Sequence, residues 1–178
     1  AEERERCLAE GMRMPSPYPG TTRLERLFEA QAALRPDAVA VVGASESLTY
    51  RDLDLRANRL ARELDASGSG APRRVGVCLE RGPDLVVALL ATLKAGAAYV
   101  PLDPDLPAER LSAMLADASV ALVLTDERLS ARLPAGAHRV VCIDRDALRI
   151  AQRPGGAVGA GDDADDLACV MYTSGSTG

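Results

Sequence analysis

The sequence predicts an α/β fold with mostly parallel sheets and helices packed between and around them. Strand-like and helix-like segments alternate along most of the chain. Residues 73–79, "RRVGVCL", form a near-continuous apolar run, as expected for the middle of a parallel sheet. Aromatic residues make up only 3% of the chain, so the apolar material is mainly Ala, Leu and Val, which suits layered helices and sheet. The 178 residues are enough for one domain.

The first third of the chain is expected to contain two helices and two short strands. After the proline-punctuated segment 15–21, a helix begins near residue 21 and ends at Pro36. Its apolar stripe consists of Leu24, Leu27, Phe28 and Leu34. Strands follow at 38–43 and 47–50, and Thr49 or Asp52 caps the next helix. That helix has one apolar face, formed by Leu53, Ala57, Leu60, Ala61 and Leu64.

The remainder repeats strand and helix. A helix opened by Pro83 and closed by Gly96 is apolar nearly all round, which predicts burial between layers. Lys94 falls in its last turn, where a cation suits the helix dipole, and we expect a structural role. The other expected segments are strands at 97–104, 120–125, 138–144 and 167–173, a helix at 107–119, a short helix or turn at 126–134, and a loop at 153–166. The apolar side of the helix at 107–119 consists of Leu111, Met114, Leu115 and Ala118.

Composition excludes several functions. The net charge is -5 and the arginines are scattered, which argues against a nucleic-acid partner. No apolar stretch is long enough to span a bilayer and the N-terminus is polar, so we expect a cytoplasmic protein with no membrane partner. The four cysteines contain no C-x-x-C pair, and we expect Cys78, Cys142 and Cys169 to be small core residues. The four carboxylates of "GDDADD" lack the spacing of a calcium loop, so no metal site is predicted.

The end of the sequence, "TSGSTG", is the strongest candidate for a binding site. It follows a strand, and ligands of open α/β sheets bind at the carboxyl ends of strands. Its glycines allow tight turns, and successive N–H groups with hydroxyl donors can surround an anion. The spacing matches neither a Walker A loop nor a dinucleotide fingerprint. The predicted phosphate-binding residues are Thr173, Ser174, Gly175, Ser176, Thr177 and Gly178.

Three ordered motifs resemble those of adenylate-forming enzymes, in the form found in adenylation domains of non-ribosomal peptide synthetases. "LACVMYTSGSTG" looks like the phosphate loop, "LTYRDL" like the first core motif and "LKAGAAYVPLDP" like the second. The resemblance covers residues 24–178 and implies the incomplete N-terminal part of an acyl-CoA-synthetase-like adenylate-forming fold. Residues 1–21 are similar to the linker from a condensation domain, so the expected division is a linker at 1–21 and the truncated adenylation domain at 22–178.

The resemblance implies a ligase that activates an amino acid with ATP and Mg²⁺ to an aminoacyl-adenylate. The acyl group then passes to the phosphopantetheine thiol of a peptidyl carrier domain, in antibiotic biosynthesis. An upstream condensation domain is an implied partner, and a small helper protein is a further candidate. The loop at 173–178 would hold the β- and γ-phosphates of ATP.

The sequence departs from the family pattern at two points, a mild change at one strand position and a larger one that bears on activity. Family members usually have tyrosine where this chain has Cys169, and their loop continues into a Pro-Lys-Gly segment that is absent here. The catalytic lysine, the ribose-binding aspartate and the amino-acid pocket would also lie further on, so no catalytic residue is assigned and the fragment is not expected to be active alone. The alternatives are a fatty-acyl or aryl-acid adenylating ligase and a non-catalytic α/β interaction module.

Overall fold

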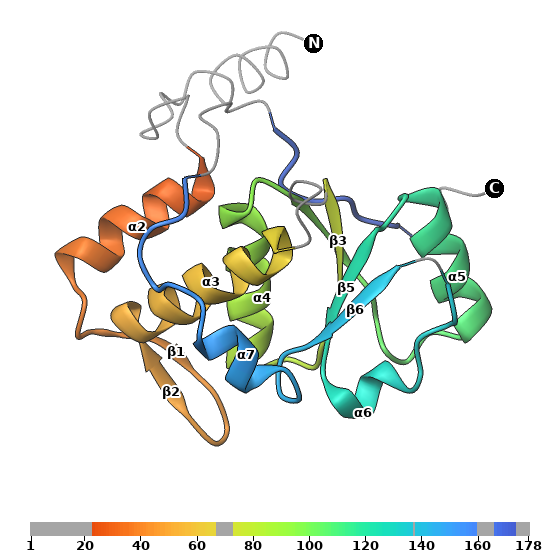
Figure 1. The fold of residues 1–178 in the computed structure, drawn as a ribbon, viewed down its shortest axis with the longest axis horizontal. Coiled ribbons are helices and arrows are strands. Elements are labelled where there is room, and N and C mark those ends of the chain that lie inside the picture. Colours follow the sequence, from red (N-terminus) through yellow and green to blue (C-terminus); the bar gives the residue numbers. More distant parts are fainter. Residues whose placement is uncertain (1–22, 67–72, 137, 160–165, 174–178) are drawn as a thin grey trace, which may run out of the picture.

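The computed structural model describes residues 23–66, 73–136, 138–159 and 166–173, in which helices and strands alternate (Figure 1). The helices are α2 (Leu24–Leu34), α3 (Tyr50–Asp65), α4 (Pro83–Lys94), α5 (Ala108–Asp117), α6 (Glu127–Ser130) and α7 (Ala147–Ala151). The strands are β1 (Val39–Val42), β2 (Ser47–Thr49), β3 (Arg74–Cys78), β4 (Ala98–Pro101), β5 (Leu122–Thr125) and β6 (Arg139–Cys142). The segment predicted as a linker, 1–21, lies outside the described residues.

Four parallel strands form the central sheet in the order β4-β3-β5-β6. Val75 of β3 is in register with Tyr99 of β4 on one side and with Leu122 of β5 on the other. Strands β1 and β2 form a separate antiparallel pair. The predicted α/β architecture with mostly parallel strands is therefore confirmed.

The two faces of the central sheet are covered differently. Helices α2, α3, α4 and α7 lie to one side of it, and α5 lies on the other (Figure 1). Alternate residues of β3 point to opposite faces, so Val75 and Val77 join the α3–α4 cluster whereas Cys78 joins the α5 cluster. Gly76 also faces α5, and a Cβ there would lie 2.8 Å from the Leu102 side chain, which explains the glycine.

Helices α3 and α4 follow their sequence signals. The predicted apolar face of α3 is buried along its whole length. Thr49 forms a capping box with Asp52: its Oγ1 accepts from the Asp52 N–H at 3.1 Å, and its own N–H donates to the Asp52 carboxylate at 3.3 Å. Pro83 opens α4, and Gly96 follows it with a φ of 73°, as predicted. Helix α4 lies between α3 and the sheet, which accounts for its apolar surface (Figure 1).

Two expectations need correction, and one helix was not expected. Leu24 and Leu34 are 59% and 72% exposed, so they do not belong to the packed stripe of α2. Helix α7 was not predicted, because five residues give too short a periodic pattern. The expected strand at 167–173 is replaced, among the described residues, by an isolated parallel bridge between Cys169 and Tyr99.

Two buried charged residues tie these helices together. Lys94, 1% exposed at the end of α4, forms ion pairs with Glu29 of α2 and with Asp54 of α3, the latter at 2.9 Å. Its predicted structural role is supported, although the partners lie on other helices. The carboxylate of Glu63 in α3 is fully buried. It pairs with Arg139, Arg149 and Arg153.

Candidate functional site

The segment 166–173 runs beside β4 at the outer edge of the central sheet. The Tyr99 N–H donates to the Ala168 carbonyl at 3.1 Å, and the Val170 N–H donates to the Tyr99 carbonyl at 3.0 Å. The pairing is parallel. Thr173 therefore emerges at the carboxyl end of the strands, where open α/β sheets bind their ligands.

Only the first residue of the predicted phosphate loop belongs to the described part of the chain. Thr173 is exposed, in the position just given. The other predicted loop residues lie outside the described residues, namely Ser174, Gly175, Ser176, Thr177 and Gly178. Their role in phosphate binding stays a prediction.

Tyr172 attaches the start of this loop to α5. Its ring packs against the apolar cluster beneath α5, and its hydroxyl donates to the Asp117 carboxylate at 2.6 Å and lies 3.3 Å from the Met114 carbonyl. Burial, followed by the hydrogen bond to Asp117, raises the pKa of Tyr172 to about 12. The hydroxyl therefore stays protonated at physiological pH and can donate its hydrogen bond to Asp117. Sequence reasoning missed this contact, because the two residues are 55 positions apart and no motif joins them.

A cleft of about 290 Å³ lies next to this attachment. Its lining combines apolar side chains with one acid and one base: Pro101, Asp103, Leu106, Arg110, Met114, Met171 and Tyr172. The guanidinium of Arg110 is the charge in this lining that favours an anion. The cleft thus adjoins the chain that leads into the predicted phosphate loop.

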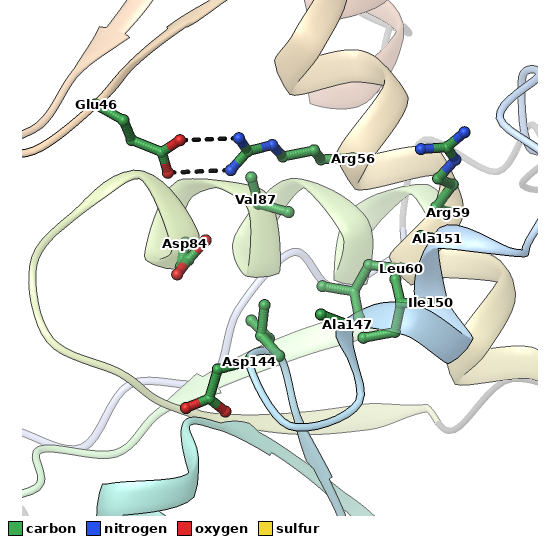
Figure 2. Close-up of a pocket in the computed structure, with 11 residues that line it drawn as sticks. Glu46, Arg56, Arg59, Leu60, Asp84, Val87, Asp144, Ala147, Ile150 and Ala151 are labelled. Atoms are coloured by element: carbon green, nitrogen blue, oxygen red, sulfur yellow. Dashed lines mark hydrogen bonds and ion pairs between the residues drawn. The ribbon is translucent and has the colours of Figure 1, made fainter.

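A larger cavity, of about 380 Å³, lies elsewhere, between the β1–β2 turn, α3, α4 and α7 (Figure 2). Arg56 and Glu46 close one wall with two hydrogen bonds of 3.0 and 2.8 Å. This pairing lowers the pKa of Glu46, whereas burial raises the pKa of Asp84. Ile143, which follows β6, lines the cavity, so it lies toward the sheet edge opposite β4. None of the described residues 166–173 lines this cavity.

The comparison with known families decides what kind of protein this fold belongs to. Residues 28–178 match the family described as AMP-binding enzyme, and this match covers most of the chain. The chain belongs to the AMP-binding enzyme family. The resemblance to this superfamily that the sequence motifs carried is thereby confirmed.

Curated relatives of this AMP-binding chain include large peptide synthases. It is 42% identical over 176 residues to one component of the linear gramicidin synthase of Brevibacillus parabrevis, a match to 99% of this chain and 3% of that protein. It is 47% identical over 159 residues to a second component of the same synthase, a match to 89% of this chain and 3% of that protein. The dimodular nonribosomal peptide synthase of Bacillus subtilis is 44% identical over 163 residues, which cover 87% of this chain and 7% of that protein. The chain therefore spans a small part of these relatives' length.

Solved structures agree with this placement. The nonribosomal peptide synthetase FmoA3 (S1046A) in its AMPPNP-bound form matches with a TM-score of 0.80 and 34% identity, over 89% of this chain and 17% of that one. The N-terminal subdomain of Klebsiella oxytoca NpsA, in complex with 3-hydroxybenzoyl-AMSN, matches with a TM-score of 0.76 and 27% identity, over 93% of this chain and 41% of that one. The partial adenylate-forming fold is thus confirmed.

The remaining candidates from the sequence are structural where they are described. Cys78 and Cys142 are buried free thiols, and burial raises the pKa of Cys78 to about 11. Cys169 is half-buried. Of the acidic loop, Asp166 is described, and it pairs with Arg23 at 2.9 Å. Among the described residues no group of three His, Cys, Asp or Glu is arranged to hold a metal ion, and no helix there is long and apolar enough to cross a membrane.

Proposed function

We propose that this chain is the N-terminal part of an adenylation domain that activates an amino acid with ATP. The relatives at 42% to 47% identity are peptide synthases, which supports an amino acid as the carboxylic substrate. The solved relative FmoA3 was determined with AMPPNP and with alpha-methyl-L-serine-AMP, which supports ATP as the second substrate. The loop at 173–178 would bind the β- and γ-phosphates.

The observation that carries the proposal is the placement of Thr173. Pairing of residues 168–170 with Tyr99 directs the chain to the carboxyl end of β4, and Tyr172 holds it against α5. A Ser/Thr/Gly run that begins at this point would supply N–H and hydroxyl donors at the carboxyl end of the sheet, where open α/β folds bind ligands. Donors held in place in this way stabilise the charge that develops on a departing pyrophosphate.

The proposed reaction has two steps. An oxygen of the amino-acid carboxylate attacks the α-phosphorus of ATP, and the bond from that phosphorus to the bridging oxygen breaks, releasing pyrophosphate. The carrier thiolate then attacks the acyl carbon of the aminoacyl-adenylate, and AMP leaves. Mg²⁺ bound with ATP would supply further charge neutralisation at the phosphates. Residues of this chain bind and orient the triphosphate, and we assign the chemical steps to none of them.

The partners follow from the same proposal. A peptidyl carrier domain would receive the acyl group on its phosphopantetheine thiol, and a solved relative of this chain, at 26% identity, is an artificially fused adenylation–PCP di-domain. An upstream condensation domain would be joined through residues 1–21, and a small helper protein remains a candidate partner. We place the enzyme in the cytoplasm, where ATP is available.

A second candidate substrate is an aryl acid. The NpsA subdomain, at 27% identity, was solved with 3-hydroxybenzoyl-AMSN, which carries an aryl group. The higher identity to the gramicidin synthases makes the amino acid our first choice.

ATP–pyrophosphate exchange by the natural polypeptide that contains this chain tests the proposal. A panel of amino acids, aryl acids and fatty acids should give exchange with an amino acid only. Exchange with aryl or fatty acids alone would show that the carboxylic substrate is not an amino acid. A polypeptide that binds no MgATP would favour the non-catalytic module.

A matched pair of variants tests the loop itself. Ser174→Ala should raise the KM for ATP about tenfold, because a hydrogen bond to a charged phosphate is lost. Ser130→Ala is the control, since it removes a hydroxyl on α6 that donates to the Glu127 carbonyl at 2.7 Å. Equal KM values for ATP in the two variants would show that the Ser174 hydroxyl does not contribute to ATP binding.

A further inference from the structure

The contact between Asp117 and Tyr172 joins the last residue of α5 to the residue before the predicted phosphate loop. We propose that Asp117, acting through the Tyr172 hydroxyl, is a positioning residue that fixes the loop in the orientation that binds the triphosphate. The inference rests on the proposed function, because it assigns a residue to the ATP site. Neither residue touches the reacting atoms in this account.

Asp117 occupies a position that its own helix disfavours. It is the final residue of α5, where the helix dipole is negative and a carboxylate is unfavourable, and the last turn of α5 contains no basic residue. Its carboxylate accepts the Tyr172 hydroxyl at 2.6 Å, a short charge-assisted hydrogen bond. The contact to the loop segment therefore offsets a local cost that α5 alone does not relieve.

The end of α5 is itself fixed to the sheet. Arg74, the first residue of β3, donates to the Ala118 carbonyl at 2.8 Å and so caps the carboxyl end of the helix. Met114 and Leu115, in the last turns of α5, are buried against the sheet. Asp117 therefore lies on a helix that is fixed to the sheet. Its hydrogen bond to the Tyr172 hydroxyl restricts the position of Tyr172.

Upstream of Tyr172 the same segment is attached to β4, because the Ala168 carbonyl accepts from the Tyr99 N–H and the Val170 N–H donates to the Tyr99 carbonyl. Met171, the next residue, is 68% exposed. The side chain of Tyr172 then provides an attachment to α5 immediately before Thr173. Removing it lets the loop entrance sample more conformations, and binding ATP must then restrict them again.

The test uses the natural polypeptide with three single variants and one double variant. Tyr172→Phe removes the hydroxyl, Asp117→Ala removes the acceptor, and Asp117→Asn keeps an acceptor oxygen. The double variant with Phe and Ala measures the coupling between the two positions. KM is measured separately for ATP and for the carboxylic substrate, and MgATP affinity is measured by calorimetry.

Tyr172→Phe and Asp117→Ala should each raise the KM and Kd for ATP about tenfold, since one or two residues must be reordered on binding. The double variant should be no worse than either single variant, because both remove the same bond. Asp117→Asn should retain most of the affinity. The KM for the carboxylic substrate should stay unchanged.

Two control variants remove the same chemical groups elsewhere. Tyr50→Phe removes a hydroxyl at the start of α3, and Asp37→Ala removes an exposed carboxylate that pairs with Arg51 at 3.0 Å. Both should leave the KM for ATP at the wild-type value. Wild-type ATP affinity in Tyr172→Phe, or equal losses for both substrates, would overturn the positioning role while leaving the proposed function intact. A wild-type polypeptide without ATP binding would overturn both.

Discussion

The two faces of the central sheet differ in the number of helices that cover them and in the contacts that hold those helices together. On one face, α2, α3, α4 and α7 form a layered core, joined by the buried charges of Lys94 and Glu63. On the other face, α5 covers the sheet, and the segment leading to the predicted phosphate loop packs beside it. The first face therefore provides the packed core of the domain. The second face, through α5, holds the segment that leads into the predicted phosphate loop.

The largest expected effects come from a matched pair of leucines, one on each face. Leu60 of α3 and Leu111 of α5 are both 1% exposed. Truncation of either to alanine should cost about 3 kcal/mol, because each leaves a cavity in a packed cluster. Denaturant unfolding of the two variants measures this cost.

The same pair separates the roles of the faces. Leu111→Ala should also raise the KM for ATP, since α5 carries Asp117, whereas Leu60→Ala should not. Equal KM values for ATP in the two variants would show that the faces do not differ in this respect.

Removal of the Glu63 carboxylate is the next largest change. Glu63→Ala leaves three guanidinium groups close together without their shared acid. The arginine side chains are 35% to 45% exposed, so water compensates in part and we expect a loss of about 2 kcal/mol. The unfolding midpoint should fall in low salt and fall less in high salt, because the repulsion is screened. An effect independent of salt would argue that the cost is one of packing.

The capping box of α3 gives a smaller effect. Thr49→Ala removes the hydroxyl that accepts from the Asp52 N–H, and we expect a loss of about 1 kcal/mol. Thr49 also lowers the pKa of Asp52 below its ordinary value of 3.8, mainly through the hydroxyl. Stability from this contact is therefore complete above that value and is lost as the pH falls through the lower folded-state pKa. The stability difference between wild type and Thr49→Ala should shrink in acid but not vanish, because the Thr49 hydroxyl still accepts from the Asp52 N–H. A constant difference down to low pH would count against the linkage.

The smallest effect is expected for an exposed ion pair at the carboxyl edge of the sheet. Arg128 and Glu80 lie 2.7 Å apart with side chains 62% and 68% exposed. Solvent and salt weaken such pairs, so Arg128→Ala should leave the unfolding midpoint unchanged within error. A clear destabilisation would show that this edge contributes more to the scaffold than its exposure indicates.

The sequence predicted the parts of the fold that depend on local pattern. The apolar face of α3, the Pro83 and Gly96 ends of α4 and the parallel strands all follow from periodicity, capping and turn chemistry. The exposure of Leu24 and Leu34 was not predictable, because an apolar stripe does not say which residues find a partner.

Contacts between residues far apart in the chain could likewise not be predicted from the sequence. The ion pairs of Glu63 join α3 to residues more than seventy positions away, and the Tyr172–Asp117 bond depends on where the last segment meets α5. Local propensity contains no information on such contacts. The "TSGSTG" motif predicts a phosphate loop, whereas the contact between Tyr172 and Asp117 of α5 is seen only in the folded structure.

One paired measurement tests the contrast between the faces most directly: the KM for ATP and the melting temperature of Tyr172→Phe and Glu63→Gln in the natural polypeptide. Tyr172→Phe should raise the KM for ATP about tenfold with little change in melting temperature, because it removes the hydrogen bond to Asp117 and leaves the α3–α4 core intact. Glu63→Gln should lower the melting temperature and leave the KM unchanged. If each variant changed both the KM for ATP and the melting temperature in the same proportion, the two faces would not have separate roles.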